Sequence, residues 1–353
     1  MTLIGLYPIA GVRRALAVGF GSFLTLLPAS ASAAASRTGP LFTSDLSVQS
    51  VMEAHGGGRG MQFDAGLDSY SGIPGANGDL ATFIGQVGIA KAQSHPAPPG
   101  IFKDGDDTAF LIKVATVNFH LNPERSVNLK VGHFEIPYGL EANISNAGEL
   151  RDFTRGRNTG LMLDWGATLN GTLPRFQYEV GLSRGSGMTY SDRFDPYALS
   201  ARIGTPADYE GYAGVNAVGL TFFRGRILNM NRSAAMERER VAVDAQYYHG
   251  PWGLLLEAST GSNGKGAGRT NVSGALAEIN LTNASETLSV YVQTLVERQR
   301  TGARASRGGS LVAGVRWSPD RHWILSLQRD EAVWRPVGAP AAGLLVLQLR
   351  HRL

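Results

Sequence analysis

Seven histidines, at positions 55, 95, 120, 133, 249, 322 and 351, are the first candidates for chemistry in this chain, but their spacing does not support it. None forms a His-x-x-x-His or His-Glu-x-x-His pair, which would place two imidazoles on one metal ion. The chain has no cysteine, which excludes a thiolate metal site, a disulfide framework and a c-type haem attachment. We therefore expect no metal site and no cofactor.

Nucleophilic catalysis has as little support. The sequence contains no Gly-x-Ser-x-Gly motif, in which a sharp turn exposes a serine nucleophile. The glycine-rich run from Gly56 to Gly60 resembles a phosphate-binding loop but lacks the strand–loop–helix setting, so we interpret it as a hairpin turn. A lipase-like Ser-His arrangement on neighbouring strands stays open as an alternative. Our prediction is a protein that is not an enzyme and has no catalytic residues.

Composition points to a folded chain outside the cytoplasm. Of 353 residues, 43% are hydrophobic and only 18% charged, with 45 glycines and a net charge of +4. No concentrated basic domain is present, so we expect no nucleic-acid partner.

The start of the chain has the features of an export signal. Arg13 and Arg14 precede an apolar run that ends near Leu27, followed by the small residues Ala31-Ser32-Ala33. This order is typical of a secretory signal peptide over residues 1–33, leaving 34–353 as one domain; an uncleaved anchor is the alternative.

The apolar residues after the signal alternate with polar ones. Leu161, Leu163, Trp165, Ala167 and Leu169 occupy every second position of one such segment. A period of two places one set of side chains on each face of a β-strand. The pattern predicts sixteen strands, near 46–54, 61–68, 81–92, 109–121, 126–136, 159–169, 175–184, 197–204, 213–223, 240–249, 252–260, 271–282, 286–296, 308–318, 322–331 and 342–352. A change of apolar phase predicts a bulge near Ala115.

The connections between these strands alternate in length. Tight turns at 122–125, 170–174, 250–251, 283–285 and 319–321 are interleaved with long polar loops, among them 137–158, 224–239 and 297–307. This alternation is typical of a transmembrane antiparallel β-barrel with short periplasmic turns and long external loops. We therefore predict an all-β barrel of sixteen strands in the bacterial outer membrane. The connections at 69–80 and 205–212 fit the scheme least well, and a secreted β-sandwich is the alternative fold.

Two segments resemble a known family of porins. The segment Val131–Glu141 reads VGHFEIPYGLE, and the segment Val243–Glu257 reads VDAQYYHGPWGLLLE. Both resemble strand junctions of the phosphate-selective porin O and P family, and the order of a long loop, Arg155-Gly156-Arg157 and a strand also fits. The resemblance implies a sixteen-stranded channel, commonly a homotrimer, that passes small anionic solutes. The sequence departs from phosphate-binding members, because it shows no clear arginine ladder or lysine cluster.

A barrel of sixteen strands encloses a water-filled channel, so function is expected from residues that line it. The strand phase predicts acidic side chains on the middle strands and basic ones near both ends of the chain, which would set up a field across the pore. Mutual pairing of these charges is the equally weighted alternative. The predicted lumen residues are Lys113, Lys130, Asp164, Glu179, Arg202, Asp244, Glu257, Glu278, Arg316 and Arg350.

The longest external connection, 137–158, is a candidate for a loop that folds inward and narrows the pore. Its arginines could hold phosphate or carboxylate groups through paired hydrogen bonds. An ordinary surface loop is the alternative. The predicted constriction residues are Glu141, Glu149, Arg151, Asp152, Arg155 and Arg157.

The sequence thus predicts an outer-membrane porin for passive diffusion of small hydrophilic solutes, with a preference for anions such as phosphate. Outer-membrane lipid is a further expected partner, because the connections 224–239 and 297–307 are rich in arginine and could bind lipopolysaccharide or attract anions. Two alternatives stay open. The barrel could sheath or anchor a partner protein, such as an electron-transfer or export component, or it could be an adhesin or receptor.

Overall fold

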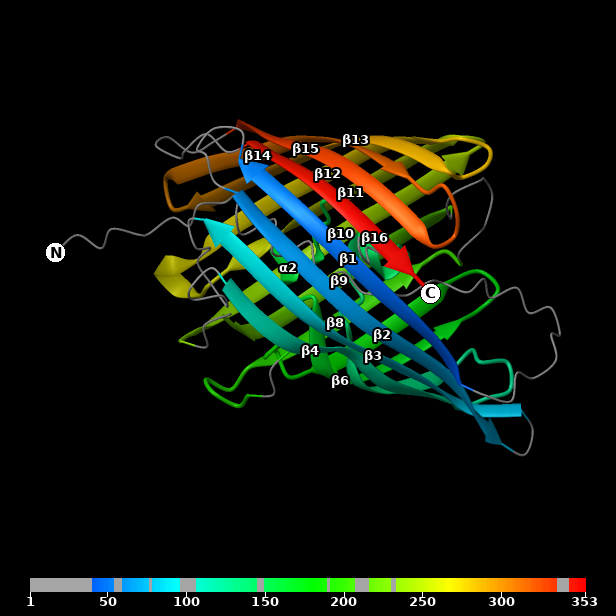
Figure 1. The fold of residues 1–353 in the computed structure, drawn as a ribbon. Coiled ribbons are helices and arrows are strands. Elements are labelled where there is room, and N and C mark those ends of the chain that lie inside the picture. The colour runs from blue at the N-terminus through cyan, green and yellow to red at the C-terminus, as the bar shows by residue number, and fades with distance from the viewer. Residues whose placement is uncertain are drawn as a thin grey trace.

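The computed structural model shows a closed antiparallel barrel of sixteen strands, which confirms the predicted fold class (Figure 1). It describes residues 40–53, 59–75, 78–95, 106–144, 149–188, 191–206, 216–229, 233–334 and 343–353. The predicted signal peptide, residues 1–33, lies outside this part of the chain. The strands are β1 (Leu41–Glu53), β2 (Arg59–Gly75), β3 (Gly78–His95), β4 (Asp106–His120), β5 (Asn128–Glu135), β6 (Leu163–Thr172), β7 (Gln177–Ser183), β8 (Tyr197–Gly204), β9 (Ala217–Leu228), β10 (Ala235–His249), β11 (Trp252–Asn263), β12 (Thr270–Thr282), β13 (Leu288–Thr301), β14 (Arg304–Trp317), β15 (Trp323–Trp334) and β16 (Gly343–Arg352).

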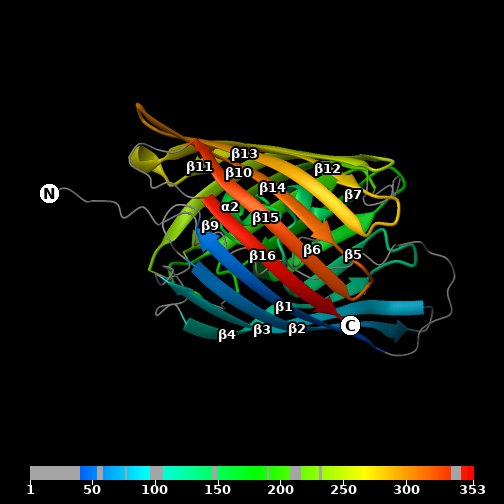
Figure 2. The same cartoon turned by 45° about the horizontal axis from the view of Figure 1, so that its top comes forward.

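The barrel closes where the first strand meets the last. β1 pairs with β16 in antiparallel register, and Ser44 and Leu353 exchange backbone hydrogen bonds of 3.0 and 2.9 Å. Because every strand has two neighbours, the sheet has no free edge. The strands cross the barrel obliquely (Figure 2), as barrel closure requires. We call the end that holds Ser44 and Leu353 the terminal end, and the opposite end the loop end.

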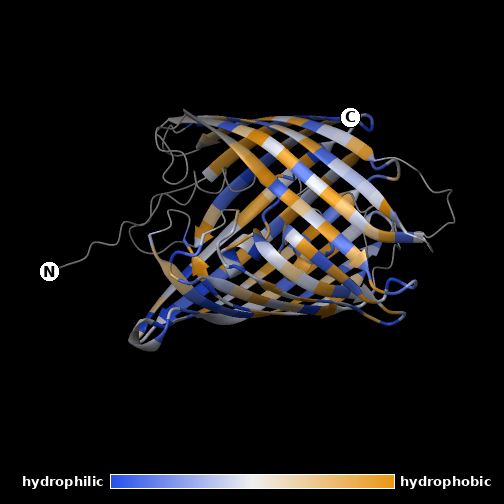
Figure 3. Cartoon of the chain, turned by 90° about the horizontal axis from the view of Figure 1, so that it is seen from below, coloured by the Kyte–Doolittle hydropathy of each residue, from blue (hydrophilic) through white to orange (hydrophobic). Residues whose placement is uncertain are grey.

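Side chains alternate between the two faces of the wall. In β10, Val241, Val243 and Tyr247 are exposed on the outside, whereas Asp244 and Gln246 are buried on the inside. Figure 3 shows this alternation as successive orange and blue bands along the strands. An apolar outside and a polar inside are the reverse of a water-soluble protein and match a lipid-facing barrel. Among the described residues, no helix is long and apolar enough to cross a membrane.

Several strands extend further than the sequence predicted. β9 ends at Leu228 and β10 begins at Ala235, so most of the predicted loop 224–239 is strand. The predicted loop 297–307 is also wrong, because only Gly302 and Ala303 separate β13 from β14. Regular pairing continues here because polar outward residues tolerate strand geometry as well as loop geometry. In the ambiguous segment 69–80, residues 69–75 belong to β2 and residues 78–80 to β3, which are paired.

A bulge in β4 occurs close to the predicted place. Val114 pairs with Gln86 and Ile112 with Val87, so Lys113 is the extra residue. The adjacent strand β5 approaches β4 closely at Gly132, which has a φ of +129°. A Cβ at that position would lie 2.0 Å from the carbonyl oxygen of Ala115. Only glycine fits this close approach.

Candidate functional site: a loop folded into the barrel

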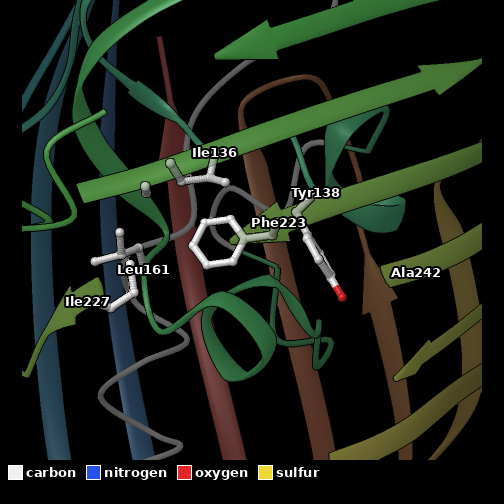
Figure 4. Close-up of a cluster of buried hydrophobic side chains, with 7 residues drawn as sticks. Ile136, Tyr138, Leu161, Phe223, Ile227 and Ala242 are labelled. Atoms are coloured by element: carbon white, nitrogen blue, oxygen red, sulfur yellow. The ribbon is translucent and has the colours of Figure 1, made fainter. Parts of the chain in front are cut away.

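The connection between β5 and β6 lies inside the barrel. It contains a short 3-10 helix, η1 (Gly139–Ala142), and one turn of α-helix, α2 (Arg155–Thr159). Ile136, Tyr138 and Leu161 of this connection pack against Phe223 and Ile227 of β9 in a fully buried cluster (Figure 4). Apolar side chains that meet inside the barrel remove surface from water, which stabilises the inward position of the segment. We refer to the described residues of this connection, 136–144 and 149–162, as the inner loop.

A second apolar cluster holds η1. Leu140 is 1% exposed and packs with four side chains from the inner faces of the next strands, which are Tyr248, Leu255, Leu276 and Leu295. Apolar residues at inward positions break the polar-inside pattern of the rest of the wall. They mark the part of the wall that the inner loop covers, and the sequence contained this signal at Leu255 and Leu276.

Glu257 of β11 is the main polar anchor of the inner loop. One oxygen of its carboxylate accepts a hydrogen bond of 3.1 Å from the backbone N–H of Leu140. The other oxygen accepts hydrogen bonds from the hydroxyl of Thr154 and, at 3.2 Å, from the amide of Asn158. The carboxylate is 4% exposed, so these bonds replace the water it loses. One side chain thereby joins both halves of the loop to the wall.

The backbone of η1 comes unusually close to this carboxylate. Gly139 has a φ of +56°, and a Cβ there would lie 2.1 Å from Oε2 of Glu257. The N–H of Gly139 also donates a hydrogen bond of 3.3 Å to the hydroxyl of Thr221 on β9. Glycine is therefore needed for the loop to approach its anchor.

The inner loop crosses the interior to the far wall. Glu149 forms a 2.6 Å ion pair with Arg316 of β14, and Leu150 packs against Leu344 and Val346 of β16. Arg151 returns to β12, where its guanidinium lies 2.9 Å from the carboxylate of Glu278. The loop thus connects the wall of β5 and β6 to the wall where the barrel closes.

Charge pairing sets the ionisation of Glu149 in the inner loop. Burial disfavours its charged form, but the guanidinium groups of Arg316 and Arg151 outweigh burial and hold its pKa below the ordinary value.

Asp152, another predicted constriction residue, is held through its backbone, which exchanges hydrogen bonds of 3.0 and 3.1 Å with the side chain of Gln293.

Glu141 behaves in the opposite way. Burial raises its pKa to about 7, although the adjacent Arg155 opposes the shift. Its carboxylate accepts a 2.6 Å hydrogen bond from the backbone N–H of Arg155, whose guanidinium also pairs with Glu135 at 2.8 Å. These contacts tie η1 to the start of α2.

The end of α2 is held by an arginine that the sequence placed in an external loop. The helix stops at Gly160, which has a left-handed φ of +81°. Arg238 of β10 donates a 3.0 Å hydrogen bond to the carbonyl of Arg157, as expected for a cation at a helix C-terminus. Its neighbour on the same face, Arg240, is 1% exposed and donates to the carbonyl of Ser262. No described carboxylate lies within ion-pair distance of Arg238 or Arg240.

All ten predicted lumen residues lie on the inward phase of their strands, and most of them form pairs. Lys130 pairs with Glu179 at 2.6 Å and Arg202 with Asp244 at 2.7 Å, each across one intervening strand, and Arg350 pairs with Asp45 at 2.8 Å across the barrel seam. Asp164 instead accepts backbone N–H hydrogen bonds from Gly185 and Gly187. Lys113 is buried at the β4 bulge. This arrangement favours mutual pairing over two walls of opposite charge.

The inner wall near the terminal end carries a polar network that sequence reasoning missed. His120 lies 3.0 Å from the hydroxyl of Thr82 and 3.1 Å from the amide oxygen of Asn128. Asn128 continues to Asn170, which donates to Asn118 at 3.1 Å. Only the strand pairing brings these residues together, because they come from β3, β4, β5 and β6.

In the described part of the chain, no group of three or more His, Asp or Glu side chains is placed to hold a metal ion.

Comparison with known proteins supports the fold. No protein-family model and no curated protein matches the chain. Among solved structures, OmpT of Vibrio cholerae, an outer membrane protein in its trimer form, superposes with a TM-score of 0.62 at 12% identity, covering 89% of this chain and 99% of that one. An anion-selective porin from Comamonas acidovorans gives 0.60 at 11% identity, with coverage of 89% and 99%. OprB of Pseudomonas putida gives 0.57 at 11% identity, with coverage of 90% and 93%. At these identities the similarity shows a porin-type barrel.

Proposed function

We propose that the chain is an outer-membrane porin that lets small hydrophilic solutes diffuse through its barrel. The observation that carries this proposal is the inner loop, a charged segment fixed inside a polar-lined barrel of the porin type. In this proposal the loop narrows the channel and leaves a passage beside it. We assign Glu141, Glu149, Arg151, Asp152, Arg155 and Arg157 to the constriction on this basis.

The proposed passage follows the inner wall of β4 to β7. The side chains of Lys130 and Glu179 on this wall keep 22% and 21% of their surface exposed, whereas Glu278, beneath the inner loop, is 1% exposed. Inner-wall side chains that stay in contact with water mark the space left beside the loop. Because most charged side chains inside the barrel are held in ion pairs, we propose no catalysed reaction.

A preference for anions such as phosphate is the finer part of the proposal. Arg238 and Arg240 lie on the inner face towards the loop end, and they donate to backbone carbonyls and an amide oxygen. Their positive charge raises the local concentration of anions at that mouth. The resemblance to the phosphate-selective family and the fold shared with an anion-selective porin support the same preference.

The sheath alternative gains no support from the structure. A partner protein threaded through the barrel would need the space that the inner loop occupies between β5 and β16. A homotrimer fits the proposal, since one structure of similar fold is a trimer form.

The proposal can be tested with the mature chain reconstituted into liposomes. Swelling in neutral sugars of increasing size is expected to show a size limit, and a salt gradient is expected to give a reversal potential on the anion side. Liposomes that contain folded barrel but do not swell in the smallest sugar would contradict the channel. Swelling with a cation-selective potential would keep the channel and refute the anion preference.

A further inference from the structure

We infer that three arginines on the outer face of β13 and β14 form a binding site for lipid phosphate groups. The arginine patch consists of Arg298 and Arg300 on β13 and Arg307 on β14. The inference rests on the proposed function in one respect, because it takes the loop end to be the external side. The occupant it names is the phosphorylated lipid of the outer leaflet.

The patch continues the lipid-facing phase of its strands. Along β13, the exposed residues Val290 and Val292 alternate with the buried Tyr291 and Gln293. The same outward phase reaches Val296 and then Arg298 and Arg300, both of which are exposed. A shift of one residue in the pairing register would turn these arginines inward, but the pairing of β13 with β12 and β14 is regular here. The arginines therefore face the membrane side of the wall and not the channel.

The height of the patch matches the edge of the apolar band. The outward run on β13, which is apolar except for Thr294, begins at Leu288 opposite Trp317 and ends at Val296. Eight steps along an antiparallel strand span about 27 Å. A tilt of about 40° reduces this to roughly 20 Å, close to the band of about 25 Å in outer-membrane barrels. Arg298 is the next outward residue, so it lies where lipid headgroups begin.

Two arginines of the patch face each other directly. Arg298 is the pairing partner of Arg307, and like charges in that position destabilise a sheet. The outward residues that pair with the patch on β12 are the neutral Ser273 and Asn271. On β15, Glu331 is already hydrogen-bonded to Arg329. Among the described residues, no carboxylate is within ion-pair distance of the patch.

Outward arginines elsewhere on the same barrel are arranged differently. Arg224 of β9 pairs with Glu239 of β10, and Arg226 pairs with Glu237. Each of these arginines has an acidic residue opposite it in the register, whereas Arg298 has another arginine. The contrast singles out the β13–β14 patch, where two arginines lie opposite each other and an anion from outside the chain would relieve their repulsion.

An aromatic side chain next to the patch supports a lipid boundary. The register shifts by one residue between β14 and β15, and this bulge pairs Trp334 with Gly309 on the outward phase. Trp334 is exposed, and its ring lies over Gly309, where a Cβ would be 2.4 Å from the ring. Tryptophan in this position is typical of the girdle at a membrane interface. Arginine forks beside it can bind phosphate oxygens in pairs. Figure 2 shows β13, β14 and β15 side by side.

Native mass spectrometry of the folded barrel tests the site. The protein is released from detergent micelles that contain either lipid A with two phosphates or the same lipid with its phosphates removed. We expect the wild type to retain the phosphorylated lipid at least about tenfold more strongly, a ratio that one charge-assisted contact can supply. The double variant Arg298→Gln/Arg307→Gln is expected to lose this preference. Arg224→Gln, whose arginine faces a glutamate on the same outer surface, is the matched control and is expected to keep it.

Equal retention of the two lipids by the wild type would overturn the inference, and this comparison needs no variant to fold. Loss of the preference in Arg224→Gln to the same extent as in the double variant would overturn it as well, because it would indicate general surface charge. The readout does not depend on conductance. A barrel that binds phosphorylated lipid but passes no ions would therefore refute the channel and leave the lipid site standing.

Discussion

Glu257→Ala is the substitution that best isolates the role of the inner loop. It removes the acceptor for the N–H of Leu140, the hydroxyl of Thr154 and the amide of Asn158. Each buried donor left without a partner costs about 1–3 kcal/mol. The minimum of about 3 kcal/mol shifts the equilibrium between the docked and the released loop roughly a hundredfold towards release. The barrel itself is expected to stay folded, because the strand pairing does not involve this side chain.

Two readouts report release of the loop. Single-channel conductance is expected to increase, because the loop leaves the lumen. The chain has no cysteine, so Leu150→Cys supplies a single reporter thiol. Leu150 is 2% exposed against β16, and a water-soluble maleimide is expected to label the thiol only after release. Glu179→Ala, which removes an inner-wall carboxylate paired with Lys130, is the control. Unchanged conductance together with an unlabelled thiol in Glu257→Ala would refute the anchoring role.

Three further predictions follow from single residues. Gly139→Ala would place a Cβ 2.1 Å from the Glu257 carboxylate and is expected to raise conductance as the loss of that carboxylate does; a wild-type value would contradict this. Burial raises the pKa of Glu141 to about 7 from an ordinary 4.5, so the stability it contributes is full below pH 4.5 and is lost as the pH rises through 7. Conductance transitions are expected to become more frequent over that range, and a Glu141→Gln variant with the same pH profile would count against the assignment. Gly132→Ala is expected to destabilise the barrel by about 1–3 kcal/mol or more, measured as its unfolding midpoint in urea, because the new Cβ meets the carbonyl of Ala115.

The sequence was sufficient for the barrel. Alternation with a period of two, interrupted by tight turns such as Gly250-Pro251, specified sixteen strands, and a change of apolar phase located the bulge within two residues of Lys113. These features are local, so a window of about ten residues contains them. Strand ends were less well predicted, because the arginines of β13 and β14 are as compatible with a loop as with an exposed strand.

Contacts between distant segments could not be predicted in the same way. The link between Glu257 and Leu140 spans 117 residues, and only the closed barrel brings the two together. The sequence predicts Arg238 in an external loop, whereas the structure shows that it holds the end of α2 from inside the barrel. One signal was present at Leu255, an apolar residue in the polar phase of its strand. An inward apolar residue of this kind indicates that something covers this part of the barrel wall. It does not indicate which segment of the chain covers it.

Planar-bilayer recording from the purified mature barrel tests the central claim most directly. The account predicts stepwise increases in conductance as single barrels insert, with a reversal potential on the anion side in a salt gradient. Insertion confirmed by protease protection, but without any conductance step, would contradict the proposal that this barrel is an open channel.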